Sequence, residues 1–384
     1  MWQAFSSTAI FYFRITFSNN TFTFTLILTI AMALGFVDAI GLLGTGLGII
    51  QFGLDNFVPD QKDAQGTIVG IKGGDGAGAS NTLVGNLFIT SARQTMISDK
   101  SNQGGKISKV YAYNSQNVQL GTAGSQTMAG NADYLTYTVD QDVPGAQGQY
   151  VGIQNGNDAT CIAWITVKMF DNSLGGAWTG DIGRSCGQSW FESQEVAGQL
   201  EDGSVYRPSC TWLDGNHDNE IPSAALKFST YSYGPDTSHV TLDRDACAST
   251  IFAADEKEIK DAPIDTSMAK RSNLQRRARL SWMEQKLVIS NIPSHSATNL
   301  CNSETSWGPD FADSYGMLCD MGTKTLYTLC SKEQIDGCVN ISTEQASNST
   351  NTASVAMQQR SIAKRTVSTA FKTYEQTSVW GDNN

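Results

Sequence analysis

Short runs of β-branched and aromatic residues, separated by clusters of Gly, Asn, Asp and Ser, dominate the chain from about residue 67 to residue 233. Several runs alternate apolar and polar side chains, which is the pattern of a strand with one buried and one exposed face. The pattern predicts strands at residues 67–72, 83–90, 107–113, 117–120, 134–139, 150–154, 161–168 and 226–233. Short strands at this spacing indicate an all-β fold, an antiparallel β-sandwich or jelly roll.

The pattern changes after this region and divides the rest of the chain into segments. Residues 61–250 form the predicted β-sandwich domain, and residues 251–285 read as a charged linker with dibasic sites. Residues 286–340 hold four cysteines and predict a small disulfide-rich module, which is too short to depend on a hydrophobic core alone. Residues 341–384 are rich in Ser, Thr, Asn and Gln, and this composition predicts a disordered tail.

The N-terminal residues are the most apolar part of the chain. Residues 1–33 predict a signal peptide that ends near Ala33, or a membrane anchor, and residues 34–60 form an apolar, glycine-rich segment. Asp38 argues against a simple membrane span, because a carboxylate inside a bilayer is costly. Translation from Met32 would remove the leader, so three interpretations of this region stay open.

All eight cysteines lie between residues 161 and 338, four on each side of a basic run at residues 270–279. An even number without any Cys-x-x-Cys motif predicts a disulfide framework and therefore secretion. Loop-closure entropy favours pairs between neighbours, although each set allows three connectivities and bridges between the sets stay open. The favoured pairs are Cys161 with Cys186, Cys210 with Cys247, Cys301 with Cys319 and Cys330 with Cys338.

Paired basic residues predict cleavage by a processing protease of the secretory pathway. The expected sites are Arg271 and Arg277 in the basic run and Arg365 near the C-terminus. Asn340 and Asn348 stand in Asn-x-Ser/Thr sequons, so we expect them to be glycosylated. If the disulfides stay within each set, a cut in the basic run would free the module.

The acidic charge of the chain, a net −11, argues against a nucleic-acid partner, because phosphate contacts require Lys and Arg. Only three histidines are present, and neither His-Glu-x-x-His nor Gly-x-Ser-x-Gly occurs. We therefore assign no catalytic residue and no cofactor, and we expect a binding protein more than an enzyme.

One polar loop has the spacing of a cation site. Asp214, Asn216, Asp218 and Glu220 place oxygen atoms at alternate positions, which can surround Ca²⁺. The loop departs from the EF-hand pattern, since Asn219 stands where that pattern needs glycine. A polar turn held by side-chain hydrogen bonds is the competing interpretation.

Three tryptophans lie in loops that are rich in Gly, Asp and Ser. An exposed indole face beside polar groups can hold a sugar, so we expect Trp178, Trp190 and Trp212, together with Asp181, to be candidate ligand-binding residues. Burial is the alternative for these rings. Trp164 lies inside a predicted strand and is expected in the core.

Several motifs carry a family resemblance: GGAWTGD at residues 175–181, CTWLDG at 210–215, TSWGPDF at 305–311 and CDM at 319–321. With these motifs the chain resembles a group of secreted proteins of filamentous ascomycete fungi. The resemblance implies a fungal source, secretion and processing at dibasic sites, and it brings no activity with it.

The first functional hypothesis is therefore a secreted, disulfide-stabilised protein that binds at a cell wall or another extracellular surface, with glycan as the favoured ligand. The alternative is a processed, membrane-active or effector-like protein that inserts residues 36–53 into a bilayer. A glycosidase is third, because the loops supply the carboxylates that such an enzyme needs. Its candidate carboxylates are Asp181, Glu192, Asp214, Asp218 and Glu220.

Overall fold

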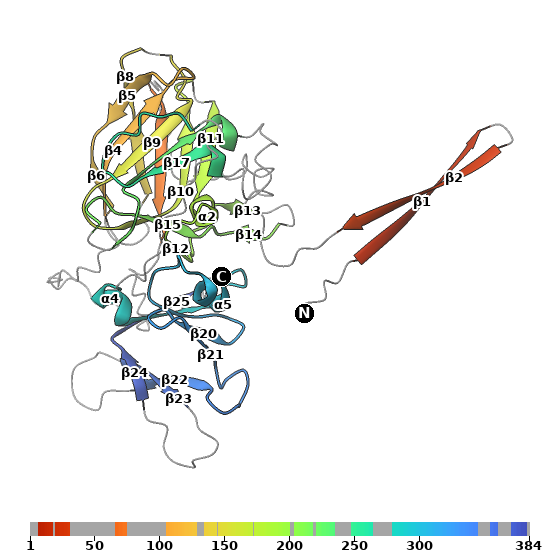
Figure 1. Cartoon of the computed structure of the whole chain (residues 1–384), viewed down its shortest axis with the longest axis vertical. Helices are drawn as coiled ribbons and strands as arrows, with labels where there is room; N and C mark the ends of the chain where they lie inside the picture. The colour runs from red at the N-terminus through yellow and green to blue at the C-terminus, as the bar shows by residue number, and fades with distance from the viewer. Residues whose placement is uncertain are drawn as a thin grey trace, which may run out of the picture.

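A computed structural model of the chain shows an all-β protein (Figure 1). It describes residues 7–17, 20–30, 66–74, 105–128, 134–143, 145–171, 173–199, 203–217, 220–234, 247–263, 279–344, 354–359 and 370–381. We call residues 66–263 the sandwich and residues 279–381 the C-terminal module. The predicted strand at 83–90, the apolar segment 36–53 and residues Asp218, Arg271, Arg277, Asn348 and Arg365 lie outside the described residues.

Two antiparallel sheets form the sandwich. Sheet I runs in the order β12 (Trp190–Phe191), β15 (Cys210–Leu213), β10 (Thr160–Lys168), β3 (Ile68–Gly73) and β7 (Tyr134–Thr138), and β11 (Leu174–Thr179) also pairs with β10. Sheet II runs in the order β17 (Thr250–Ala253), β16 (Ala225–Ser229), β9 (Tyr150–Asn155), β4 (Lys106–Tyr113), β5 (Gln119–Ala123) and β8 (Asp140–Gln141), and β6 (Gln126–Thr127) also pairs with β4. The predicted β-sandwich is confirmed.

The sandwich also contains shorter elements. A two-stranded ribbon and three short helices lie beside the two sheets. They are β13 (Gly198–Gln199), β14 (Val205–Tyr206), α2 (Gly180–Ser185), η2 (Tyr231–Tyr233) and η3 (Cys247–Ser249).

Apolar side chains fill the space between the sheets. In strand β10, the alternation of the strand and a β-bulge decide which side chains point into this space. Ile165 and Val167 belong to this inner core, as the alternation of a strand requires, and so does Ile162. A β-bulge between Ile162 and Trp164 inserts one residue and turns Trp164 to the other face of sheet I. Trp164 is fully buried, which confirms its predicted place in a core.

Two disulfides close the sandwich, and their pairing differs from the prediction. Cys161 bonds Cys210, which joins the neighbouring strands β10 and β15, and Cys186 bonds Cys247 at the ends of α2 and η3. The expected bridges between nearest neighbours in sequence are therefore wrong here. The register of β10 and β15 pairs Cys161 with Trp212, so Cys210, two residues from Trp212, lies diagonally next to Cys161. This fixed geometry outweighs a small difference in closure entropy.

The C-terminal module contains two further sheets. A five-stranded sheet runs in the order β21 (Thr325–Thr328), β20 (Met317–Asp320), β19 (Asp310–Ala312), β18 (Lys286–Ser290) and β25 (Gln376–Trp380). A three-stranded sheet consists of β22 (Val339–Glu344), β23 (Ser354–Gln359) and β24 (Ala370–Tyr374). The module's helices are α4 (Ser281–Glu284) and α5 (Ala297–Asn302). Disulfides Cys301–Cys319 and Cys330–Cys338 confirm the two predicted pairs in this part.

The C-terminal residues are folded where we predicted a disordered tail. Strand β25 pairs in parallel with β18 and forms one edge of the module's larger sheet. Met357, Tyr374 and Trp380 are buried, at 0%, 1% and 2% exposure. The prediction for 341–384 is thus wrong for residues 341–344, 354–359 and 370–381, because a few apolar anchors hold a segment whose average composition is polar. The predicted linker also contains structure, since β17 completes sheet II and α4 opens the module.

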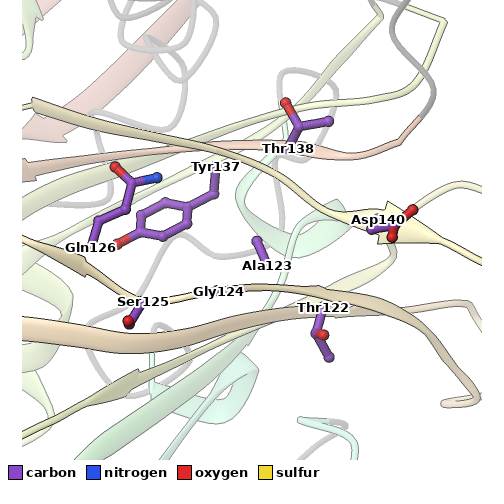
Figure 2. A pocket seen from close by; sticks show the side chains of 8 residues that line it. All are labelled: Thr122, Ala123, Gly124, Ser125, Gln126, Tyr137, Thr138 and Asp140. Carbon is purple, nitrogen blue, oxygen red and sulfur yellow. The ribbon is translucent and has the colours of Figure 1, made fainter.

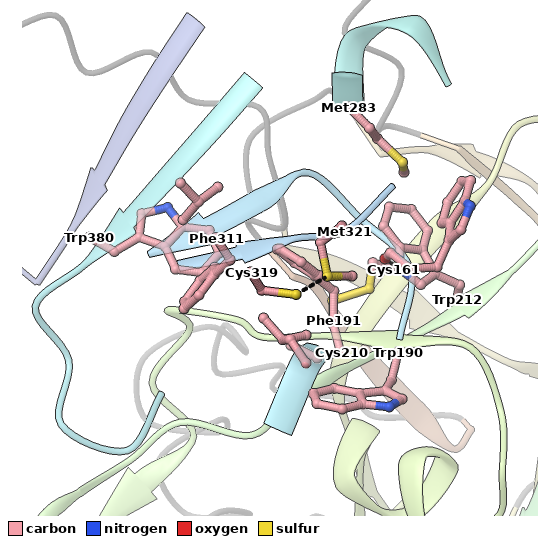
Figure 3. Packing of buried hydrophobic residues seen from close by; sticks show 14 of the residues in the cluster. Cys161, Trp190, Phe191, Cys210, Trp212, Met283, Phe311, Cys319, Met321 and Trp380 are labelled. Carbon is pink, nitrogen blue, oxygen red and sulfur yellow. Dashed lines mark hydrogen bonds between the residues drawn. A yellow bond between two sulfur atoms is a disulfide. The ribbon is translucent and has the colours of Figure 1, made fainter. Parts of the chain in front are cut away.

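The sandwich and the module share one hydrophobic core on the outer face of sheet I (Figure 3). Trp190, Phe191 and Trp212 of the sandwich pack in this cluster with Phe311 and Trp380 of the module. The module is therefore not the independent unit that the sequence suggested: it covers the face of sheet I that points away from sheet II.

The N-terminal strands β1 (Ser7–Phe17) and β2 (Asn20–Ile30) pair as an antiparallel hairpin, which Figure 1 shows apart from the sandwich. They lie where the sequence suggested a leader or an anchor. Among the described residues, no helix has the length and apolarity required to cross a bilayer.

Candidate functional site

The three loop tryptophans do not form a ligand platform. Trp178, Trp190 and Trp212 are 0%, 1% and 0% exposed, so their ring faces are closed to a sugar. The indole nitrogens donate to partners within the chain: Trp178 Nε1 to Thr250 Oγ1 at 3.2 Å, Trp190 Nε1 to Ser303 Oγ at 3.0 Å and Trp212 Nε1 to the Trp307 carbonyl at 3.1 Å. The prediction of exposed rings is wrong, and these tryptophans hold the fold together.

Asp181 likewise has a structural position. It lies in the first turn of α2, where its carboxylate accepts hydrogen bonds from Tyr206 Oη at 2.6 Å and from the Ser209 backbone N–H at 2.9 Å. These bonds attach the ribbon β13–β14 and the start of β15 to the helix. Burial raises the pKa of Tyr206 well above its usual value, and the nearby Asp181 charge adds to this rise.

Glu192, like Asp181, is a candidate carboxylate for a glycosidase. Its side chain is buried, and the residue is only 5% exposed. Burial raises its pKa to about 7, against the lowering effect of the Arg184 guanidinium, and the Asp181 charge raises it further. The Ser296 backbone N–H donates to Glu192, so this carboxyl joins the end of β12 to the N-terminus of α5. Asp181 and Glu192 do lie close enough to interact, yet neither lines either of the two pockets described below.

The predicted calcium loop does not gather its ligands. Asp214 is buried, whereas Asn216 and Glu220 are exposed, and a cation needs oxygens that share one shell. His217 holds the turn instead, through a 2.6 Å hydrogen bond between its Nδ1 and the Ile221 carbonyl. Within the described ranges no group of three or more His, Cys, Asp or Glu side chains is placed to hold a metal ion.

A polar pocket of about 430 Å³ lies where strands of both sheets meet, and the sequence did not predict it (Figure 2). Strands β5, β6 and β8 of sheet II and β7 of sheet I surround it. Its exposed or half-exposed polar side chains carry hydroxyl, amide and carboxylate groups: Thr122, Ser125, Gln126, Thr138 and Asp140. We call this the β5–β8 pocket.

Two features fix the walls of the β5–β8 pocket. Gly121 pairs with Gln141 across β5 and β8, and a Cβ at Gly121 would lie 1.7 Å from the Asp140 carbonyl oxygen. Only glycine allows so close an approach of the two strands. Gln126 Nε2 donates to the Thr136 carbonyl at 2.9 Å, and the buried ring of Tyr137 closes the interior side. All of the polar groups except Ser125 are thus held on paired strands.

A second pocket, of about 290 Å³, lies between the sandwich and the module. Arg184 and Ser185 of the sandwich line it with Asn299, Asn302, Ser303 and Thr305 of the module, and Trp190 closes its inner end. The Arg184 guanidinium lies 3.8 Å from the centre of the Trp190 ring and donates to Ser209 Oγ at 3.2 Å. Arg184 therefore covers the indole that a sugar would need to stack on.

Comparison of the sequence with models of known protein families found no match, and a search of curated proteins found no similar protein.

Proposed function

We propose that the protein is secreted and binds a glycan of a cell wall or another extracellular surface in the β5–β8 pocket. Four disulfides that use all eight cysteines support an oxidising, extracellular location. The resemblance of the tryptophan and cysteine motifs to secreted fungal proteins supports the same location. Asn340 is exposed on β22, as an N-glycosylation site requires.

The observation that carries the proposal is the set of polar groups around the β5–β8 pocket. The hydroxyls of Thr122, Ser125 and Thr138 both donate and accept hydrogen bonds, as sugar hydroxyls do, and Asp140 accepts them. A volume of about 430 Å³ lies within the range of small-ligand sites. Because four of the five groups stand on paired strands, binding would cost little ordering entropy.

The proposal is tested by measuring glycan binding with the mature, disulfide-bonded protein. A glycan array identifies the ligand, and isothermal titration gives its affinity for the wild type and for Thr122→Val/Thr138→Val. Valine keeps the shape of threonine and removes two hydroxyls, so we expect the dissociation constant to rise about tenfold. Asp140→Asn tests the acceptor role of the carboxylate.

Thr373→Val is the matched control, because Thr373 is exposed on β24 of the module, outside the β5–β8 pocket. It should leave the affinity unchanged. An array without any bound glycan, or an affinity that the double substitution does not change, would overturn the proposal.

A further inference from the structure

The sandwich and the module have no covalent connection besides the main chain between residues 263 and 279. All eight cysteines lie among the described residues, and each bridge closes within one part. The connecting segment contains the basic pairs Lys270-Arg271 and Arg276-Arg277. Whether the two parts stay together after a cut there depends only on the contacts between them.

Backbone hydrogen bonds join the parts as two neighbouring strands are joined. Trp190 of β12 pairs in parallel with Ser306 of the module. The Trp190 N–H donates to the Thr305 carbonyl at 3.3 Å, and the Trp307 N–H donates to the Trp190 carbonyl at 2.9 Å. Residues 305–307 therefore extend sheet I beyond its edge strand, which is how a peptide binds to an exposed sheet edge.

Aromatic rings interlock behind this edge. The rings of Trp212 and Trp307 lie 5.0 Å apart at 87°, and those of Phe191 and Phe311 lie 5.8 Å apart at 86°. Both pairs have the edge-to-face geometry that aromatic rings prefer. A Cβ on Gly308 would lie 2.4 Å from the Phe191 ring, so the module backbone fits closely against the sandwich.

The module is fixed at the point where it begins. Arg279, the last residue of the basic run, is bound by the buried Asp310, with 2.7 Å between Arg279 Nη1 and Asp310 Oδ1. Asp310 also accepts from Tyr374 Oη at 2.6 Å and forms an ion pair with Lys372. A cut after Arg271 or Arg277 leaves Arg279 and this network within the module.

The sandwich is fixed on the other side of the connection. Residues 255–263 lie across the outer face of sheet II, where the Ile259 N–H donates to Tyr111 Oη at 3.0 Å. The ammonium of Lys227 donates to the Ile259 carbonyl at 3.0 Å and lies 3.4 Å from the centre of the Tyr113 ring. Each end of the connection is thus attached to its own part.

We propose that the outer face of sheet I, with Trp190, Phe191 and Trp212, is a subunit interface whose partner is the C-terminal module, and that cleavage in the basic run yields two chains in one non-covalent complex. The complex retains the aromatic core, the strand pairing at Trp190 and both sets of disulfides. The module is then a bound subunit and not a released fragment.

The experiment uses the full chain, cut by a dibasic-specific protease. We expect two bands on a non-reducing denaturing gel and one particle of unchanged mass by native size-exclusion chromatography with light scattering. Two separate native particles would overturn the proposal. If the protease does not cut, a site-specific protease sequence in place of residues 270–277 allows the same measurement.

Two glycine-to-alanine variants, one at the interface and one away from it, test whether the interface holds the two cut chains together. After cleavage, Gly308→Ala should raise the dissociation constant of the two chains about tenfold or more, because the new Cβ meets the Phe191 ring. Gly124→Ala is the matched control, since no atom lies within 4 Å of its added Cβ. Equal dissociation constants for the two cut variants would contradict the assigned interface.

Discussion

The sandwich fills the space between sheets I and II with apolar side chains, whereas the module places a buried aspartate, Asp310, in the middle of its larger sheet. Arg279 and Lys372 compensate the charge of this aspartate. The sandwich obtains its stability from the area that two stacked sheets bury. The module has short strands and depends more on two disulfides, an ion network and the aromatic core that it shares with sheet I. Size explains this difference, because a small unit buries a smaller fraction of its surface.

Asp310→Asn should have the largest effect on stability, and it should affect the module first. The substitution keeps the shape and leaves Arg279 without its buried anion, which costs about 3–5 kcal/mol when one partner of a buried ion pair is lost. Urea unfolding followed by tryptophan fluorescence measures the loss. The exposed pair Lys257–Asp255 gives the control, since its side chains are 79% and 71% exposed and Asp255→Asn should change nothing measurable. Equal midpoints for the two variants would contradict the role of Asp310.

The boundary between the parts should give the stability an unusual dependence on pH. Glu192 has a pKa of about 7 in the folded protein, above its ordinary 4.5, because burial favours the neutral carboxyl. Its contribution to the free energy of unfolding is therefore complete below pH 4.5 and is lost as the pH rises through 7. His295 lies on the module side of the same boundary, and burial lowers its pKa to about 3. Its contribution to the free energy of unfolding is therefore complete above pH 6.5 and is lost as the pH falls toward 3. Between pH 4.5 and 6.5 the two changes oppose each other.

Glu192→Gln separates these two contributions. The variant should lack the loss of about 3 kcal/mol that the Glu192 carboxyl contributes between pH 4.5 and 7, and should keep the opposing gain from His295, because the neutral amide does not titrate. Urea midpoints at several pH values measure the difference between variant and wild type. Glu256→Gln, at an exposed position, is the control and should run parallel to the wild type. If the urea midpoints of Glu192→Gln also run parallel to those of the wild type, the ionisation of Glu192 does not affect stability.

Gly121→Ala should have a smaller effect, confined to the sandwich. Its Cβ would meet the Asp140 carbonyl and force β5 away from β8, at a cost of about 1–3 kcal/mol. The same shift should weaken any ligand in the β5–β8 pocket. Thermal unfolding and glycan titration measure the two effects. Gly124→Ala, whose added Cβ meets no protein atom, is the control for stability and should leave the melting temperature unchanged. Thr373→Val remains the control for binding. A stable Gly121→Ala variant with normal binding would mean that the close approach of β5 and β8 is not needed.

Strand periodicity predicted most of the sandwich. The residues of β3, β4, β9 and β10 fall within one residue of the ranges expected, because alternating β-branched and aromatic side chains carry a local signal. The module's last strands carried no such signal. Strand β25 has the sequence QTSVW, and Trp380 anchors it against residues that lie far away in the chain.

Other features depend on contacts between distant residues, which no local pattern encodes. Trp212 is buried because Trp307 covers it, and the two are 95 residues apart in the chain. Doubling a loop costs only about 0.6 kcal/mol, so loop length could not decide between Cys186 and Cys210 as the partner of Cys161. The β5–β8 pocket was missed because its polar residues come from two sheets and form no motif. Arg279 was grouped with the basic run, although it is a buried structural arginine.

Peptide mapping of the mature, non-reduced protein by mass spectrometry tests most directly the claim that two separately bridged parts share one core. The account predicts four linked peptides that contain Cys161–Cys210, Cys186–Cys247, Cys301–Cys319 and Cys330–Cys338. A linked peptide that joins any of the first four cysteines to any of the last four would contradict it, because the two parts would then be tied by a covalent bond and not by their aromatic interface.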